Sequence, residues 1–145
     1  MEYFFDDDGN LIRETTRNEA GDLDRLGDQP AVIDYCPKTG VAKRWEWWRD
    51  QKPHRDGDKP AIYEIYPETG QERGRAYYKN GKAHTEENEV TAVRYTERGT
   101  YISRSFSIAG RRHRTDGPAL ETYNRDTGEL ERAQYFLMGK EVEPF

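Results

Sequence analysis

Three histidines recur along the chain at a nearly constant interval, and histidine is a common metal ligand. His54, His84 and His113 lie 30 and 29 residues apart. If they belong to successive hairpins, they lie two strands apart, roughly 10 Å, whereas zinc needs its ligand nitrogens about 2 Å away. The lone Cys36 offers no Cys-x-x-Cys partner. We therefore expect no metal site, and we expect each histidine to hydrogen-bond backbone in the loop between units.

Carboxylates are the other group that could do chemistry, as general acids or bases. Asp56-Gly57 and Asp116-Gly117 have the composition of turns, because aspartate bonds its own backbone and glycine accepts positive φ. The pair Glu86-Glu87 does not stand out in a chain with 35% charged residues. The sequence also lacks a nucleophile elbow, a phosphate-binding loop and a His-Glu-x-x-His motif. It therefore predicts no catalytic residues, no cofactor and a protein that is not an enzyme.

Aromatic and arginine side chains are the stronger candidates, as a binding surface. A thin sheet with 18 aromatic residues cannot bury both of its faces, and such residues carry much of the energy of protein interfaces. The alternative is that they only cover the core or pair across strands. The candidate partner-binding residues are Trp45, Trp48, Arg75, Tyr78, Arg104, Arg132, Phe136, Asp6, Asp7 and Asp8.

Nucleic acid is the competing ligand. An arginine stripe interleaved with tyrosines could follow phosphates while the rings stack on bases. Interspersed glutamates weaken this interpretation. The arginines concerned are Arg73, Arg75, Arg94, Arg98, Arg104, Arg111, Arg112 and Arg114.

A repeat of about 30 residues must position these side chains. The proline that heads each copy is followed ten residues later by the glycine of a Thr-Gly pair, and an aromatic residue lies seven residues beyond that glycine. These landmarks are Pro30, Pro60 and Pro118, then Gly40, Gly70 and Gly128, then Trp47, Tyr77 and Tyr135. A degenerate copy has Val90, Gly99 and Phe106. The spacing predicts a tandem array of four units.

Each unit has the pattern of a strand, a Thr-Gly turn, a second strand and an Asn-Gly type turn. We therefore expect an all-β protein of tandem antiparallel β-hairpin repeats that form an extended twisted meander sheet. The units lie near residues 25–53, 54–83, 84–112 and 113–140 of an array spanning 25–145. Residues 1–24 are expected to form an acidic N-terminal hairpin or cap, within one structural domain overall.

Alternation along the strands divides the aromatic residues between two faces. Trp45 and Trp47 are expected on one face, and Glu46 and Trp48 on the other. Tyr78 and Phe136 would share the face of Trp48. One aromatic row is therefore expected to form the core and the other to remain available for binding.

Composition bounds the class of protein. Val, Ile, Leu and Phe supply only 22 of 145 residues, so aromatic residues must build a thin core. No apolar run approaches the roughly 18 residues of a membrane helix, and one cysteine excludes an internal disulfide framework. We expect a cytoplasmic protein that does not bind membranes and is a monomer or homodimer. Residues 1–28 carry a net charge of −6, so the acidity belongs to this segment.

The repeat resembles the long-form, variant MORN repeats of bacterial, phage and large-virus proteins. The resemblance rests on Asn80-Gly81-Lys82-Ala83-His84 and on the run from Gly110 to Ala119, and it covers residues 25–140. The usual MORN glycine-rich core motif is missing, so the match is with the variant class. The resemblance implies a hairpin-built sheet and a scaffold, binding or antitoxin-like role, such as a phage or bacterial-conflict inhibitor that blocks or tethers a partner protein.

Overall fold

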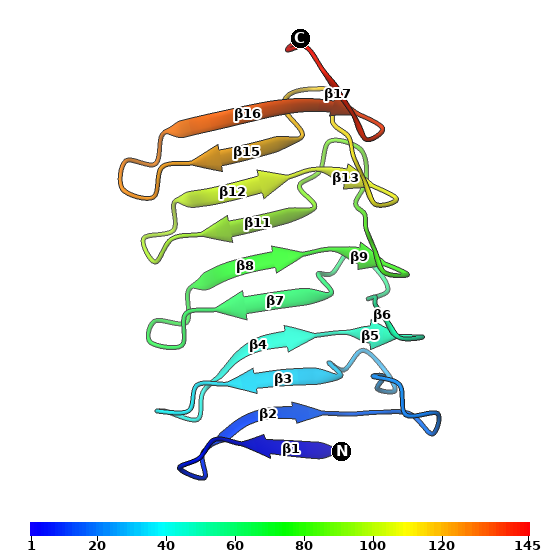
Figure 1. Ribbon diagram of the computed structural model, residues 1–145, viewed down its shortest axis with the longest axis vertical. Helices are drawn as coiled ribbons and strands as arrows, with labels where there is room; N and C mark the ends of the chain where they lie inside the picture. The colour runs from blue at the N-terminus through cyan, green and yellow to red at the C-terminus, as the bar shows by residue number, and fades with distance from the viewer.

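The computed structural model describes all residues, 1–145, and it is a single-layer antiparallel sheet (Figure 1). Its eleven strands follow one another in the order β1-β2-β3-β4-β7-β8-β11-β12-β15-β16-β17. No helix is present, and so none that could cross a bilayer. The expected all-β meander of hairpins is confirmed.

Five long hairpins make up most of the sheet. Their strands are β1 (Glu2–Phe5) and β2 (Leu11–Thr15), β3 (Val32–Tyr35) and β4 (Ala42–Glu46), β7 (Ile62–Ile65) and β8 (Glu72–Ala76), β11 (Ala92–Tyr95) and β12 (Tyr101–Ser105), and β15 (Leu120–Tyr123) and β16 (Leu130–Leu137). Every one of them has a register shift beside its turn. A bulge at the same place in each hairpin increases the local twist in the same way, so the hairpins can stack with a constant offset.

Shorter hairpins continue the long ones at the opposite end. They pair β5 (Trp48–Arg49) with β6 (Lys52–Pro53), β9 (Tyr78–Lys79) with β10 (Lys82–Ala83), β13 (Ser107–Ile108) with β14 (Arg111–Arg112), and the end of β16 with β17 (Lys140–Val142). In the second of these, Asn80 and Gly81 have φ values of 51° and 82°. Both residues of a two-residue type I′ turn require positive φ, which explains the Asn-Gly signal in the sequence.

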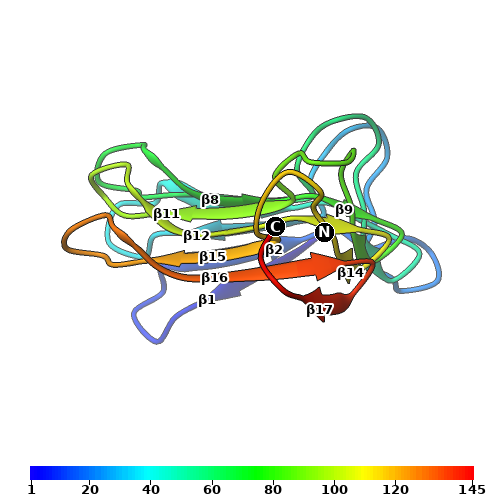
Figure 2. The ribbon, with the colours of Figure 1, turned by 90° about the horizontal axis from the view of Figure 1, so that it is seen from above.

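The sheet has two different faces. The loops between units rise on one side of the sheet, as the end-on view shows (Figure 2). We call this side the loop face. It carries Trp47, Tyr77 and Phe106, while Trp48 and Tyr78 project to the other side, which we call the groove face.

The core is thin and lies mainly on the loop face. Only 13 of 145 residues are buried, and most of the buried apolar ones share this face. Phe106 is among them, and it belongs to the predicted core row. Small residues next to the aromatic row let the loops pack closely. The buried residues of this face include Ala31, Ala61, Thr91, Val93 and Ala119.

The N-terminal hairpin is continuous with the array. Strand β2 pairs with β3 through Arg13↔Asp34 and Thr15↔Val32, as β4 pairs with β7 in the next unit. A second turn follows, closed by the bridge between Arg17 and Leu23. The first hairpin and this turn are therefore part of the same sheet as the array.

Candidate functional site

The structure divides the predicted binding residues between the two faces. Trp45 lies opposite Tyr63 on the loop face, with ring centroids 6.0 Å apart. Arg75 and Arg104 occupy the same cross-strand row, since each pairs with Val93. The remaining sheet residues of the set, Trp48, Tyr78, Arg132 and Phe136, lie on the groove face. The two groups cannot contact one flat partner surface together.

The two loop-face arginines are already committed to partners within the chain. Arg104 forms an ion pair with Glu121 at 2.7 Å, and Arg75 forms one with Glu72 and a 3.3 Å hydrogen bond to Tyr95. Burial alone would lower the pKa of Arg75, but the Tyr95 hydrogen bond and the Glu72 charge outweigh it and raise the pKa. These side chains are therefore better suited to holding the sheet together than to binding a ligand.

The groove face has an aromatic row with one gap. Tyr78 and Phe136 are half-buried, and between them the equivalent position is Ser107, which is buried. The gap leaves a hollow of about 640 Å³ with a floor that includes Ala92 and Ser107. Arg112 stands at its side, 5.7 Å from the centre of the Phe136 ring. We call this hollow the Ser107 groove.

Trp48 occupies a second hollow of the same face. Its indole Nε1 donates to Glu46 at 2.9 Å, which fixes the ring over the groove face as the alternation predicted. Phe4 of the N-terminal hairpin and Val32 line the same hollow, of about 680 Å³. The Trp-rich first copy and the N-terminal hairpin thus form one continuous surface.

The three N-terminal aspartates lie at a turn, beyond the end of β1. The Asp6 carboxylate accepts bonds from the backbone of Asn10 and Asp8 at 2.8 and 3.0 Å, and from the Asn10 side chain. The Asn10 backbone bond is the main reason that the pKa of Asp6 is lowered. Asp6 therefore builds the turn, and of the three only Asp7 and Asp8 are exposed.

Each recurring histidine joins its inter-unit loop to the next tight turn along the chain. Nδ1 of His54 accepts a hydrogen bond from the backbone NH of Asn80 at 2.9 Å. His84 and His113 do the same with Ala109 and Met138, at 3.0 Å in both cases. The prediction of a backbone partner is confirmed, but the partner lies in the next tight turn, 25 or 26 residues along the chain, and not in the inter-unit loop. Only the stacked register brings the two together.

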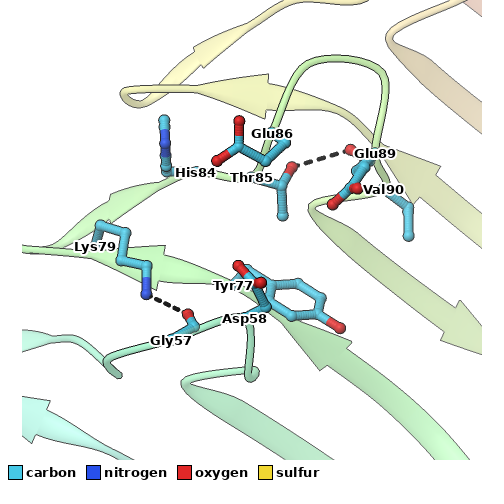
Figure 3. A pocket seen from close by; sticks show the side chains of 9 residues that line it. All are labelled: Gly57, Asp58, Tyr77, Lys79, His84, Thr85, Glu86, Glu89 and Val90. Atoms are coloured by element: carbon cyan, nitrogen blue, oxygen red, sulfur yellow. Dashed lines mark hydrogen bonds between the residues drawn. The ribbon is translucent and has the colours of Figure 1, made fainter.

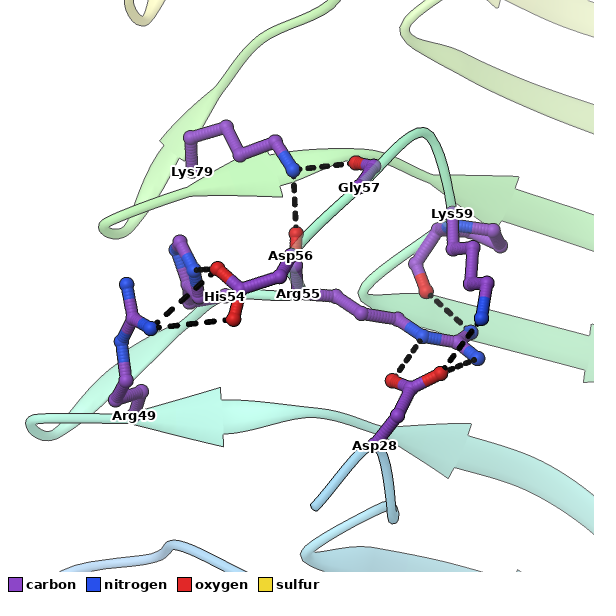
Figure 4. Close-up of polar contacts among 9 residues, drawn as sticks. Asp28, Arg49, His54, Arg55, Asp56, Gly57, Lys59 and Lys79 are labelled. Carbon is purple, nitrogen blue, oxygen red and sulfur yellow. Dashed lines mark hydrogen bonds and ion pairs between the residues drawn. The ribbon is translucent and has the colours of Figure 1, made fainter. Parts of the chain in front are cut away.

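The inter-unit loop is closed by an arginine that sequence reasoning missed. Arg55 lies over the Trp47 ring at 3.7 Å from its centre and donates to the Pro60 carbonyl at 3.1 Å. Asp28 of the preceding loop binds the same guanidinium at 2.9 and 3.1 Å, as Figure 4 shows. The Arg55 side chain is only 15% exposed. The signal was its recurrence at one repeat position, shared with Arg114.

The expectation for the two Asp-Gly pairs needs a correction. The Asp56 carboxylate bonds His54 at 2.8 Å and not its own backbone (Figure 4). Gly57 has the expected positive φ of 78°, but Gly117 does not. A Cβ at Gly117 would instead meet the Arg114 guanidinium carbon at 3.0 Å. A side chain at this position would therefore press on the Arg114 guanidinium, which passes close to the backbone.

No three His, Cys, Asp or Glu side chains are grouped so that they could hold a metal ion. The hollows on both faces are instead lined by aromatic rings, small residues and charged side chains, which suits non-covalent binding. In comparisons with known proteins, no family model matches the chain, and neither a curated protein nor a solved structure matches it.

Proposed function

We propose that this chain is a non-enzymatic binding protein that holds a partner protein on the groove face of its sheet. The observation that carries the proposal is the gap at Ser107 in the aromatic row. A continuous aromatic row would only cover the sheet. The space left by one missing ring instead accepts an apolar side chain of the partner between Tyr78 and Phe136.

The surroundings of the groove support a protein ligand. Arg111 and Arg112 are exposed at its side, and neither forms an ion pair within the chain. Aromatic residues and arginine, with methionine, are the types enriched in protein interfaces. Met138 also lines the groove and is exposed. The partner expected here presents an apolar side chain next to a carboxylate.

Nucleic acid is the less favoured ligand, because three of the eight arginines in the predicted stripe are neutralised within the chain. Arg75, Arg104 and Arg114 each pair with a carboxylate. Phosphate binding depends on arginines and lysines that are free to replace counterions.

The repeat pattern supports a relationship to the variant MORN class, and with it a scaffold or inhibitor role in the cytoplasm. In a phage or bacterial conflict setting, blocking a partner requires only a rigid surface. The stacked hairpins, joined by the histidine and arginine contacts, supply such a surface.

The test is affinity capture from a lysate of the source organism, with the wild-type chain and two variants as baits. Ser107→Tyr completes the aromatic row and fills the groove. Glu68→Tyr adds the same ring at an exposed turn on the opposite edge and serves as the control. We expect one protein to be retained by the wild type and by Glu68→Tyr, and lost with Ser107→Tyr.

Two outcomes would refute the proposal. One is equal retention by all three baits, which would place the contact elsewhere on the surface. The other is retention of nucleic acid that nuclease removes and that weakens steeply with added salt, in which case the arginine stripe is the binding element. Circular dichroism of both variants should match the wild type, so that loss of binding is not loss of fold.

A further inference from the structure

The third inter-unit loop lacks the arginine that closes its neighbours. Thr85 stands at the repeat position of Arg55 and Arg114. Arg114 lies 3.9 Å from the centre of the Phe106 ring and donates to the Pro118 carbonyl at 3.1 Å, as Arg55 does with Trp47 and Pro60. The short Thr85 side chain instead bonds the Glu89 carbonyl at 2.9 Å. It cannot cover the ring of Tyr77 as an arginine would.

A pocket of about 460 Å³ lies where that arginine side chain would be (Figure 3). The three groups that hold Arg55 all have counterparts in its lining. Tyr77 takes the place of Trp47, Asp58 that of Asp28, and Val90 that of Pro60. The pocket therefore has the ring, carboxylate and carbonyl positions that hold a guanidinium group in the second loop, but it contains no guanidinium group.

Two of these counterparts, the Asp58 carboxylate and the Val90 carbonyl, have no partner in the chain. Asp58 forms no ion pair, although Asp28 at the equivalent position binds both Arg55 and Lys59. The Val90 carbonyl accepts no hydrogen bond, whereas the Pro60 carbonyl accepts one from Arg55. A ligand that satisfied both would make the contacts that Arg55 makes with Asp28 and with the Pro60 carbonyl.

The charge around the pocket favours a cation. Glu86 and Glu89 line it together with Asp58, and all three are exposed at its rim. Lys79 is the one cation of the lining, and its ammonium group is held by the carbonyls of Arg55 and Gly57 (Figure 3 shows the latter bond). The pocket lining therefore carries three carboxylates and one ammonium group, which is already hydrogen-bonded within the chain, so its net charge is negative.

We propose that this pocket binds the guanidinium group of an arginine side chain presented by a protein partner. A planar guanidinium stacks on the Tyr77 ring while its NH groups reach the Asp58 carboxylate and the Val90 carbonyl. A lysine ammonium cannot make these contacts together, because it is a point charge without a planar fork. The Arg55 side chain, which is only 15% exposed, shows the expected orientation of the bound guanidinium.

This site is separate from the Ser107 groove. Tyr77 and Tyr78 are adjacent in the chain and project to opposite faces of the sheet, so a ligand in one site does not touch the other. A test with small probes needs no knowledge of the partner, and its failure would leave the groove proposal standing.

The test is a titration followed by NMR through the backbone amides of Tyr77, Thr85 and Thr91. The probes are an end-blocked Gly-Arg-Gly peptide, its Gly-Lys-Gly counterpart and free L-arginine. We expect saturable shifts with the arginine peptide, and binding of the lysine peptide weaker by roughly tenfold. Free arginine should bind no better than the peptide; if it binds tighter, the natural ligand is the amino acid and the assignment to a protein partner is overturned.

Two variants complete the test. In Thr85→Arg the chain fills its own pocket, so binding of the arginine peptide should disappear while the melting temperature rises. Gln71→Arg adds the same charge at an exposed position outside the pocket and should leave binding unchanged. Undiminished binding by Thr85→Arg, or equal shifts from the arginine and lysine peptides, would overturn the proposal.

Discussion

Alanine substitution of Gly81 tests how the tight turns stack along the array. Gly81 has a φ of 82°, and a Cβ built there would lie 3.1 Å from Cβ of Lys52 in the preceding turn. Gly70, in the turn between β7 and β8, has nearly the same φ, 78°, but a Cβ there meets nothing within 4 Å. Comparing the two alanine substitutions therefore separates the cost of backbone strain from the cost of crowding between neighbouring turns.

The expected magnitudes follow from these two geometries. Left-handed backbone costs an L-residue roughly 1–2 kcal/mol, and the loss of glycine's freedom in the unfolded chain offsets about 0.4–1 kcal/mol of that. Gly70→Ala should therefore cost about 1 kcal/mol. Gly81→Ala should cost on the order of 1 kcal/mol more, because the added methyl group is forced against Lys52. At roughly 2–4 °C per kcal/mol, the two melting temperatures should differ by several degrees.

The assay is thermal unfolding by circular dichroism, with each substitution also made in a Lys52→Gly background. Lys52→Gly removes the Cβ that crowds position 81, so the two alanine substitutions should then cost the same. Equal losses in the original background would refute the reasoning, since they would mean that the turns do not press on one another.

Further outcomes test the contacts between units and between strands. His54→Ala should cost about 1 kcal/mol in urea unfolding, because the Asn80 NH loses its acceptor in the buried imidazole; an unchanged midpoint would show that the bond to the next turn does not stabilise the array. Glu121→Ala should cost about 3 kcal/mol, since Arg104 loses the carboxylate it is buried against, and Glu121→Gln should recover part of the loss by keeping a hydrogen-bond acceptor. Asp28 has a pKa well below its usual range, because of its hydrogen bonds to the Arg55 guanidinium and then to Lys59. Its contribution is therefore fully present above about pH 4 and is lost as the pH falls towards the lowered pKa; Asp28→Asn should flatten this part of the stability profile, and an identical acid profile for the variant would contradict the ion pair.

The hairpin array could be predicted because its signals are local. Positive φ at Gly40, Gly70 and Gly81 is a property of single turns, and the alternation of Trp47 and Trp48 is a property of any strand. The candidate binding site was predictable only in part. Alternation separated Trp48 from Trp45, but the sequence did not show that Arg75 would be committed to Glu72.

The sequence by itself determined the turns and the strand pattern, since each depends on residues close together in the chain. Only the tertiary structure decided which residues about one repeat apart in the sequence lie in contact. His54 meets Asn80 and Asp28 meets Arg55 because the bulged hairpins stack with one offset, which no single unit encodes. The same stacking shows that Thr85 leaves an aromatic ring, a carboxylate and a carbonyl without the arginine that joins such groups elsewhere.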